Sequence, residues 1–114
     1  MKQRGILPLS AQEIKNTIIG KTIKGDWGAF RKYVCYIDPR GSAEGINDLG
    51  TIAVGNWSID MTTNIISFVW DSYWDTWAGR MYKMDETILL FDDQSHQMRT
   101  SIHTIEDGKQ KLKL

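Results

Sequence analysis

The sequence predicts a mainly β fold, an antiparallel up-and-down β-barrel of eight or nine short strands preceded by one short α-helix. Three observations support this fold class. Apolar and polar residues alternate along most of the chain after residue 20, which is the period of a half-buried strand. Turn signals recur at a spacing of roughly 8–12 residues, as in sandwiches and barrels. The connections between the strand segments are short, which favours a meander over a Greek key.

The helix is expected over residues 11–19. Ser10 and Glu13 have the spacing of a capping box, in which each side chain accepts a hydrogen bond from the other residue's backbone N–H. Two isoleucines four residues apart share one face of this helix. Gly20 suits the left-handed position that follows a helix. Because so short a helix is unstable alone, we expect it to pack against the barrel.

The strands are expected between turns that have a physical basis. Residues 38–41 are Asp-Pro-Arg-Gly, in which proline sets the first central φ and aspartate bonds the local backbone. Asp107-Gly108 is the signature of a two-residue hairpin, and Gly55 inside a strand indicates a bulge or a tight bend. The expected strands are 21–27, 29–37, 42–46, 51–60, 65–70, 77–84, 87–91, 98–105 and 110–114.

Length and charge limit the classes of function. The 114 residues contain no linker or repeat, so we expect a single domain over 1–114. Lys plus Arg equals Asp plus Glu at 14 each, and this balance argues against electrostatic binding to nucleic acid or to an anionic membrane. No apolar run approaches the length of about 18 residues that a membrane-spanning helix needs.

Cys35 is the one cysteine in the chain, so an intramolecular disulfide is excluded. Its place on a strand indicates a small buried hydrophobic residue, with a reactive thiol as the alternative. The apolar run at the N-terminus is too short for a signal peptide. Taken literally, the chain is cytoplasmic; it is periplasmic or secreted if a signal peptide has been removed ahead of Met1.

Residues 70–77 hold three of the five tryptophans, one tyrosine and two aspartates. If the stretch alternates like a strand, Trp70 and Trp74 lie on one side and Tyr73 and Trp77 on the other. In the alternative interpretation, Trp70 and Trp77 fill the barrel ends while Tyr73 and Trp74 cap a long hairpin. Exposing several large rings on a small monomer is unfavourable, so we expect part of this stretch to meet a ligand or a partner.

Two acids, Asp71 and Asp75, lie among these rings. An aromatic face beside a carboxylate suits sugars, which stack on rings and donate hydroxyls, and cationic amines, which lie over a ring near a negative charge. The same acids could act as general acid and base. Carboxylates at hairpin ends usually face solvent, however, and we do not favour catalysis here.

The barrel interior is the second candidate site. A barrel of eight strands is just wide enough for packed side chains or one small ligand. Arg80, if it faces inward, could bind an anionic group bidentately; alternatively it is solvated or pairs with Asp71 or Asp75. The residues that we expect to line the interior are Phe30, Tyr36, Trp57, Phe68, Arg80 and Tyr82.

No pattern fixes a reaction. Asp92, Asp93, His96 and His103 lack the spacing of a metal site, and the two aspartates suit a turn equally well. No glycine-rich phosphate loop follows a strand, and no serine lies in a nucleophile elbow. We therefore predict no cofactor, no metal and no catalytic residues, and favour a binding protein over an enzyme.

Five short motifs of this chain resemble known proteins. They lie at residues 9–14, 20–22, 33–41, 56–60 and 68–70. Together they are similar to small bacterial lipocalin-like (calycin-type) proteins and, more narrowly, to an uncharacterised bacterial family known only as a domain of unknown function. The resemblance covers most of the chain and implies a barrel fold. It implies no catalytic residues.

The related family commonly looks secreted and often has cysteines on the two strands that flank the aromatic stretch. This chain has Ser67 and Ala78 in about those places. The disulfide that the resemblance would imply is therefore absent here.

We predict that the protein binds a small, partly apolar ligand without catalysis, at the barrel mouth and the aromatic hairpin 70–77. The alternative is a protein-interaction or inhibitor module, including a homodimer, that docks through the same hairpin. The predicted ligand-binding residues are Trp57, Trp70, Asp71, Tyr73, Trp74, Asp75, Trp77, Arg80 and Tyr82.

Overall fold

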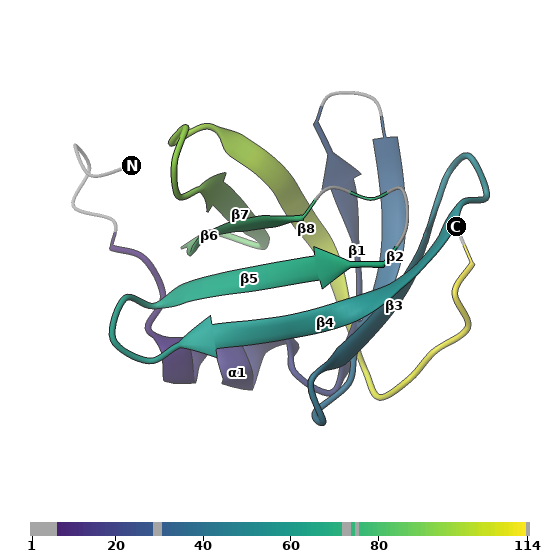
Figure 1. Cartoon of the computed structure of the whole chain (residues 1–114), viewed down its shortest axis with the longest axis horizontal. Helices are drawn as coiled ribbons and strands as arrows, with labels where there is room; N and C mark the ends of the chain where they lie inside the picture. The colour runs from purple at the N-terminus through teal and green to yellow at the C-terminus, as the bar shows by residue number, and fades with distance from the viewer. Residues whose placement is uncertain (1–6, 29–30, 72–73, 75, 114) are drawn as a thin grey trace.

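The described residues form one short helix and one closed antiparallel barrel, as predicted. The computed structural model describes residues 7–28, 31–71, 74 and 76–113. Within them, each strand pairs with the next, and β8 returns to pair with β1 (Figure 1). The elements are α1 (Ala11–Ile18), β1 (Lys21–Trp27), β2 (Arg31–Ile37), β3 (Ser42–Asn47), β4 (Ile52–Asp60), β5 (Ile65–Trp70), β6 (Trp77–Met84), β7 (Thr87–Asp92) and β8 (Met98–Asp107).

The α1 helix begins at the predicted capping box and ends one residue before the predicted limit. The backbone N–H of Glu13 donates to Ser10 Oγ at 3.1 Å, and Glu13 Oε1 accepts from the Ser10 N–H at 2.8 Å. Gly20 follows with a φ of +79°, the left-handed region that glycine tolerates. Ile14 and Ile18 are fully buried in the core (both 0% exposed), so the apolar face of α1 stabilises both the helix and the barrel.

The two ends of the barrel differ. Figure 1 shows α1 lying beneath β4 and β5, and the Ala11 N–H donates to Asn64 Oδ1 in the β4–β5 turn at 2.8 Å. This helix closes the end where β2 joins β3 and β4 joins β5. The strands β1, β3, β5 and β7 finish at the opposite end, which α1 leaves uncovered. In the described part of the chain, the interior is therefore open toward that second end, called the mouth below.

Two details of the predicted strands are wrong. Residues 110–113 form no strand, because the chain after β8 runs beside the start of β1: the Gly108 N–H donates to Gly20 O, and the Gln110 N–H to Thr22 Oγ1. Residue 114 lies outside the described residues. The bulge expected at Gly55 as an alternative to a tight bend is absent, because the pairing there is regular; the register shifts at Lys24/Gly25 and Leu90/Phe91 instead.

A close approach of the neighbouring strand explains why position 55 is a glycine. A Cβ built there would lie 2.2 Å from the backbone oxygen of Val69, so the neighbouring strand approaches too closely for any side chain.

No helix in the described part of the chain has the length and the apolar character that crossing a membrane requires.

Candidate functional site

A cavity of about 160 Å³ lies inside the barrel and reaches the mouth. Its floor includes Ile18 of α1, and its lower wall includes Cys35 and Ile102. Its upper wall is aromatic, because inward-facing positions of four strands and the loop after β5 carry rings. These rings are Trp27, Tyr33, Phe68, Trp70, Trp74 and Trp77.

Five of these rings contact one another in sequence around the mouth. Trp27 meets Trp77 edge to face with centroids 5.5 Å apart, and Trp77 stacks on Phe68 at 5.7 Å. Phe68 stacks on Trp70 at 5.9 Å, and Trp70 meets Trp74 edge to face at 4.8 Å. Offset stacks and edge contacts are the favoured geometries for aromatic pairs. The mouth therefore has a fixed aromatic wall.

Trp74 reaches back over the mouth from the loop that joins β5 to β6. The β5–β6 pairing stops at Phe68 and Trp77, so the two strands separate at the mouth. The Trp74 ring lies against the backbone of Gly45 on β3, where a Cβ would come within 2.8 Å of the ring carbon Cη2. The absence of a side chain at Gly45 gives this ring its position across the barrel opening.

The indole N–H of Trp74 is buried and has no hydrogen-bond partner among the residues that the structure describes. Buried donors are nearly always paired in native proteins, because an unpaired one loses its hydrogen bond to water. This N–H belongs to a ring that lines the cavity. It is therefore an unpaired donor, within the described residues, on a ring that borders the space a ligand would fill.

Tyr33 supplies an acceptor in the same cavity. Thr100 Oγ1 lies 2.7 Å from the backbone oxygen of Asp26 and 2.7 Å from the Tyr33 hydroxyl. The carbonyl can only accept, so the single Thr100 proton goes there and the Tyr33 hydroxyl donates to Thr100. The lone pairs of Tyr33 are left to accept. Burial raises the pKa of Tyr33 well above its ordinary value, which keeps the phenol protonated.

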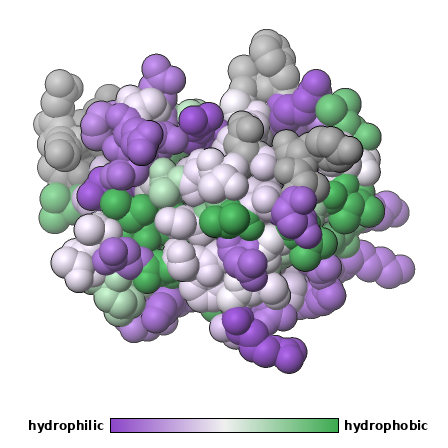
Figure 2. Space-filling model, in the orientation of Figure 1, coloured by the Kyte–Doolittle hydropathy of each residue, from purple (hydrophilic) through white to green (hydrophobic). Residues whose placement is uncertain are grey.

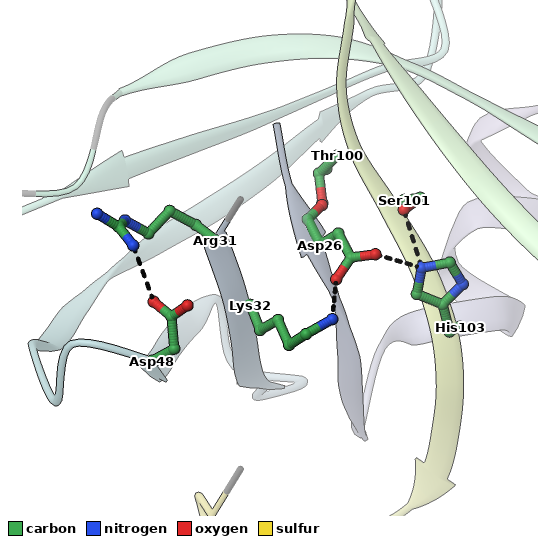
Figure 3. A network of polar contacts seen from close by, with 7 residues as sticks. All are labelled: Asp26, Arg31, Lys32, Asp48, Thr100, Ser101 and His103. Atoms are coloured by element: carbon green, nitrogen blue, oxygen red, sulfur yellow. Dashed lines mark hydrogen bonds and ion pairs between the residues drawn. The ribbon is translucent and has the colours of Figure 1, made fainter. Parts of the chain in front are cut away.

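Two cations lie at the mouth, and their side chains point different ways (Figure 3). Lys32 Nζ is 3.1 Å from Asp26 Oδ1, a close ion pair. Arg31 Nη1 is 3.8 Å from Asp48 Oδ1, too far for a good hydrogen bond. Arg31 lines the cavity and shares the parity of Tyr33 on β2, and a guanidinium has five N–H donors.

Figure 3 also shows a serine, a histidine and an aspartate together on the outer face of the barrel. Ser101 Oγ is 3.1 Å and Asp26 Oδ2 is 2.9 Å from His103, but both contact the same ring nitrogen, Nε2. A catalytic triad needs the serine and the acid on opposite nitrogens, so that one can lose a proton while the other orients the ring. This arrangement cannot perform that relay.

The Asp26 carboxylate has a structural role. Its hydrogen bond with His103, followed by that with Lys32, holds the pKa of Asp26 below the usual range. The ionised group joins β1 to β8 on one side and to β2 on the other.

Cys35 is buried in the cavity wall, and burial raises the pKa of its thiol well above the ordinary value. A neutral, enclosed thiol is a poor nucleophile. The described residues contain no cluster of three or more potential metal ligands. Asp92 instead accepts from the backbone N–H groups of Gln94 and Ser95 and from Arg99, which is the turn that the sequence also allowed.

The structure brings together only part of the predicted site. Trp70, Trp74 and Trp77 all line the cavity, so the predicted alternation, with Trp77 on the other side, is wrong: Trp70 ends β5 and Trp77 begins β6. Asp71 is exposed and outside the cavity lining. Tyr73 and Asp75 lie outside the described residues.

The other predicted residues lie away from the cavity. Trp57 is half-buried, and its indole N–H donates to the backbone oxygen of Asp38 at 2.7 Å, beside the β2–β3 turn. Arg80 and Tyr82 alternate with Met81 of the core, so they lie on the opposite face of β6. Arg80 pairs with Asp93 at 2.8 Å, and not with Asp71.

The expected interior set is corrected in the same way. Phe68 lines the cavity, whereas Tyr36 lies on the outer face of β2 with Lys109 over its ring. Phe30 lies outside the described residues. Sequence reasoning recognised the alternation along β2 but assigned the wrong face to the interior, and so missed Arg31 and Tyr33.

Trp27 and Thr100 were also missed. Trp27 had a signal in the sequence, because it is an aromatic residue at the end of a predicted strand; its indole contacts Trp77. Thr100 had no such signal, because its burial is explained only by partners distant in the chain.

Comparison with protein-family models, with curated proteins and with solved structures found no match to this chain.

Proposed function

We propose that the protein is a lipocalin-like (calycin-type) binding protein of bacterial type that holds one small, partly apolar molecule in the mouth cavity without catalysing its reaction. The carrying observation is the cavity of about 160 Å³ with its aromatic wall. Ligand pockets are mostly apolar and contain a few polar groups that orient the ligand. The Trp74 N–H donor and the Tyr33 oxygen acceptor are groups of this kind.

The size of the cavity supports a ligand of about one ring. An engineered protein cavity of about 150 Å³ binds benzene, and the present cavity is similar in volume. The proposal includes no nucleic-acid or membrane partner, because the formal net charge is zero.

The alternative, docking of a partner protein or a second copy through the aromatic hairpin, has less support. The described rings of this stretch line the cavity and do not form an outer apolar surface. On the face seen in Figure 2, hydrophobic residues occur as separate spots among polar ones. Val54 and Val69 are exposed apolar residues on the neighbouring strands β4 and β5, and exposed apolar residues are common on monomers.

The test uses tryptophan fluorescence as a built-in reporter, because four of the five tryptophans line the cavity. Toluene and benzoate serve as neutral and anionic probes, and binding is measured by ligand-observed NMR. We expect at least one probe to bind and to change the tryptophan fluorescence. The Cys35→Leu variant, which fills the cavity, should lose probe binding, whereas Tyr82→Phe on the outer face should retain it.

If neither probe binds and neither changes the tryptophan fluorescence, ligand binding in this cavity is rejected. A dimer in native mass spectrometry that dissociates in Trp74→Ala would then favour the interaction module.

A further inference from the structure

We propose that the ligand is a small aromatic carboxylate, with its ring among the mouth tryptophans and its carboxylate bonded to the Trp74 N–H and the Arg31 guanidinium. This inference rests on the proposed function and adds the chemical class of the ligand. Three observations carry it: an unpaired donor, the sign of the charge at the mouth, and the shape of the cavity.

The unpaired donor requires an acceptor. The Trp74 indole nitrogen is buried, and an indole N–H can only donate. A ligand oxygen that accepts from it would restore the hydrogen bond that burial has removed. A hydrocarbon ligand would leave the donor unpaired, and an ammonium ligand would place two donors face to face.

The charge at the mouth selects an anion. Among the described residues that line the cavity, the charged side chains are Arg31 and Lys32, and none is a carboxylate. The nearby Asp71 is exposed and outside the lining. Within the described lining, an amine or a sugar therefore meets no carboxylate, whereas a ligand carboxylate meets two cations; Asp75 lies outside the described residues.

Of the two cations, Arg31 has the longer ion pair among the described residues. Lys32 is held by Asp26 at 3.1 Å, and its side chain is 70% exposed. Arg31 Nη1 is 3.8 Å from Asp48 Oδ1, and Figure 3 shows the two side chains pointing toward one another. A guanidinium has five N–H donors in a planar fork that matches a carboxylate, so it can hold the ligand without giving up Asp48.

The shape of the cavity selects a flat ring. Trp27, Phe68, Trp70 and Trp77 form the wall, and their stacked and edge contacts fix the planes between which a ligand lies. The volume of about 160 Å³ suits one ring with one substituent. A long acyl chain does not fit, because α1 closes the floor.

The experiment compares three probes of similar size by calorimetry with the full chain: benzoate, toluene and benzylamine. Benzoate should bind at least tenfold more tightly than toluene, and benzylamine should bind no better than toluene. Arg31→Gln should weaken benzoate binding about tenfold while toluene binding stays unchanged, since one charge-assisted pair is lost.

Two further variants separate this geometry from a general charge effect. Lys32→Gln removes the same charge from the neighbouring residue and should change benzoate binding less than twofold. Trp74→Phe retains a ring but removes the N–H, and should weaken benzoate binding about fivefold with little effect on toluene. Circular dichroism checks that each variant is folded.

The possible results point to different conclusions. Binding of toluene or benzylamine as tight as that of benzoate would overturn the carboxylate proposal and leave the binding function standing. Equal losses in Arg31→Gln and Lys32→Gln would overturn the assignment of Arg31. Failure of all three probes would reject the binding function itself.

Discussion

At the scale of single residues, the mouth depends on a glycine opposite a tryptophan. Gly45 provides the space that the Trp74 ring occupies, and the ring in turn contacts Trp70. A Cβ at Gly45 would lie 2.8 Å from the Trp74 ring and 2.9 Å from the backbone oxygen of Val34. A side chain at position 45 would therefore lower the free energy of unfolding in two ways, through its contact with the Trp74 ring and through its contact with the β2 backbone.

This division predicts a coupling between the two positions. Gly45→Ala should lower the free energy of unfolding by about 1–3 kcal/mol, the usual cost of overpacking. In the Trp74→Ala background the same change should cost about 1 kcal/mol less, because only the sheet contact remains. Urea denaturation of the four proteins measures the cycle. Equal costs in both backgrounds would show that Trp74 does not lie on Gly45 in solution.

The residue scale is also where sequence reasoning was weakest. The composition of residues 70–77 identified Trp70, Trp74 and Trp77 as candidates, and all three line the cavity. Arg80 and Tyr82 were chosen for their chemistry, but strand alternation states only that two faces exist. Which face is interior depends on the register with β5 and β7, and no local signal encodes it.

At the scale of elements, β5 and β6 share only a short stretch of strand pairing in the described part of the barrel. Only three register pairs join these strands, against six for β4–β5 and six for β6–β7. One of the three is Ser67 opposite Ala78. The register places these two residues directly across the ladder.

We therefore predict that the double variant Ser67→Cys/Ala78→Cys forms a disulfide. Directly opposed residues of an antiparallel pair have the Cα separation that a disulfide needs. Closing a loop of this length should raise the free energy of unfolding by about 2–3 kcal/mol. Mass spectrometry and urea denaturation with and without reductant measure both effects. Cys35 is replaced by serine in the variant and in its parent, and failure to oxidise would contradict the register.

The elements themselves were the most predictable part. The α1 capping box, the Asp38–Gly41 turn and most strand limits follow from local chemistry. The predicted last strand failed because Asp107 and Gly108 look like a hairpin tip. The tail instead binds β1 through Thr22, a contact between residues 86 and 88 positions apart, which local sequence does not reveal.

At the scale of the whole molecule, ionised aspartates hold different parts of the barrel together. Asp60 accepts from the backbone N–H groups of Thr63 and Thr62, which lowers its pKa. Asp92 accepts from Ser95 and Gln94 at the mouth, which lowers its pKa to about 2. Asp26, which joins β1 to both neighbouring strands, also has a lowered pKa. These three carboxyl groups therefore lose their protons at a lower pH in the folded state than in the unfolded chain.

The stability of the barrel should therefore fall in acid. A carboxyl whose pKa is lowered by folding contributes stability above its unfolded pKa of about 4, and that contribution is lost as the pH falls through the folded pKa. For Asp92 the loss spans about pH 4 to about pH 2. Urea midpoints should be level above about pH 5 and decline below about pH 4.

Asp92→Asn tests whether the Asp92 carboxylate causes this loss of stability in acid, because the amide oxygen can still accept hydrogen bonds from the turn but the side chain cannot ionise. We expect the variant to be less stable at pH 7 and to lose less stability between pH 4 and pH 2. Asp107→Asn, whose side chain is 94% exposed, is the control for removing one negative charge. An unchanged acid profile in Asp92→Asn would contradict a role for this carboxylate.

The sequence by itself determined the fold class, the single helix, the short connections and the region rich in aromatic residues. Each of these depends on interactions between residues that are near in the chain: capping, turn geometry and hydrophobic period. Only the tertiary structure decided which residues form the site. The cavity joins Trp27 and Arg31 to Trp74 and Thr100, because barrel closure by β1 and β8 and the fold-back of the β5–β6 loop bring distant positions to one mouth.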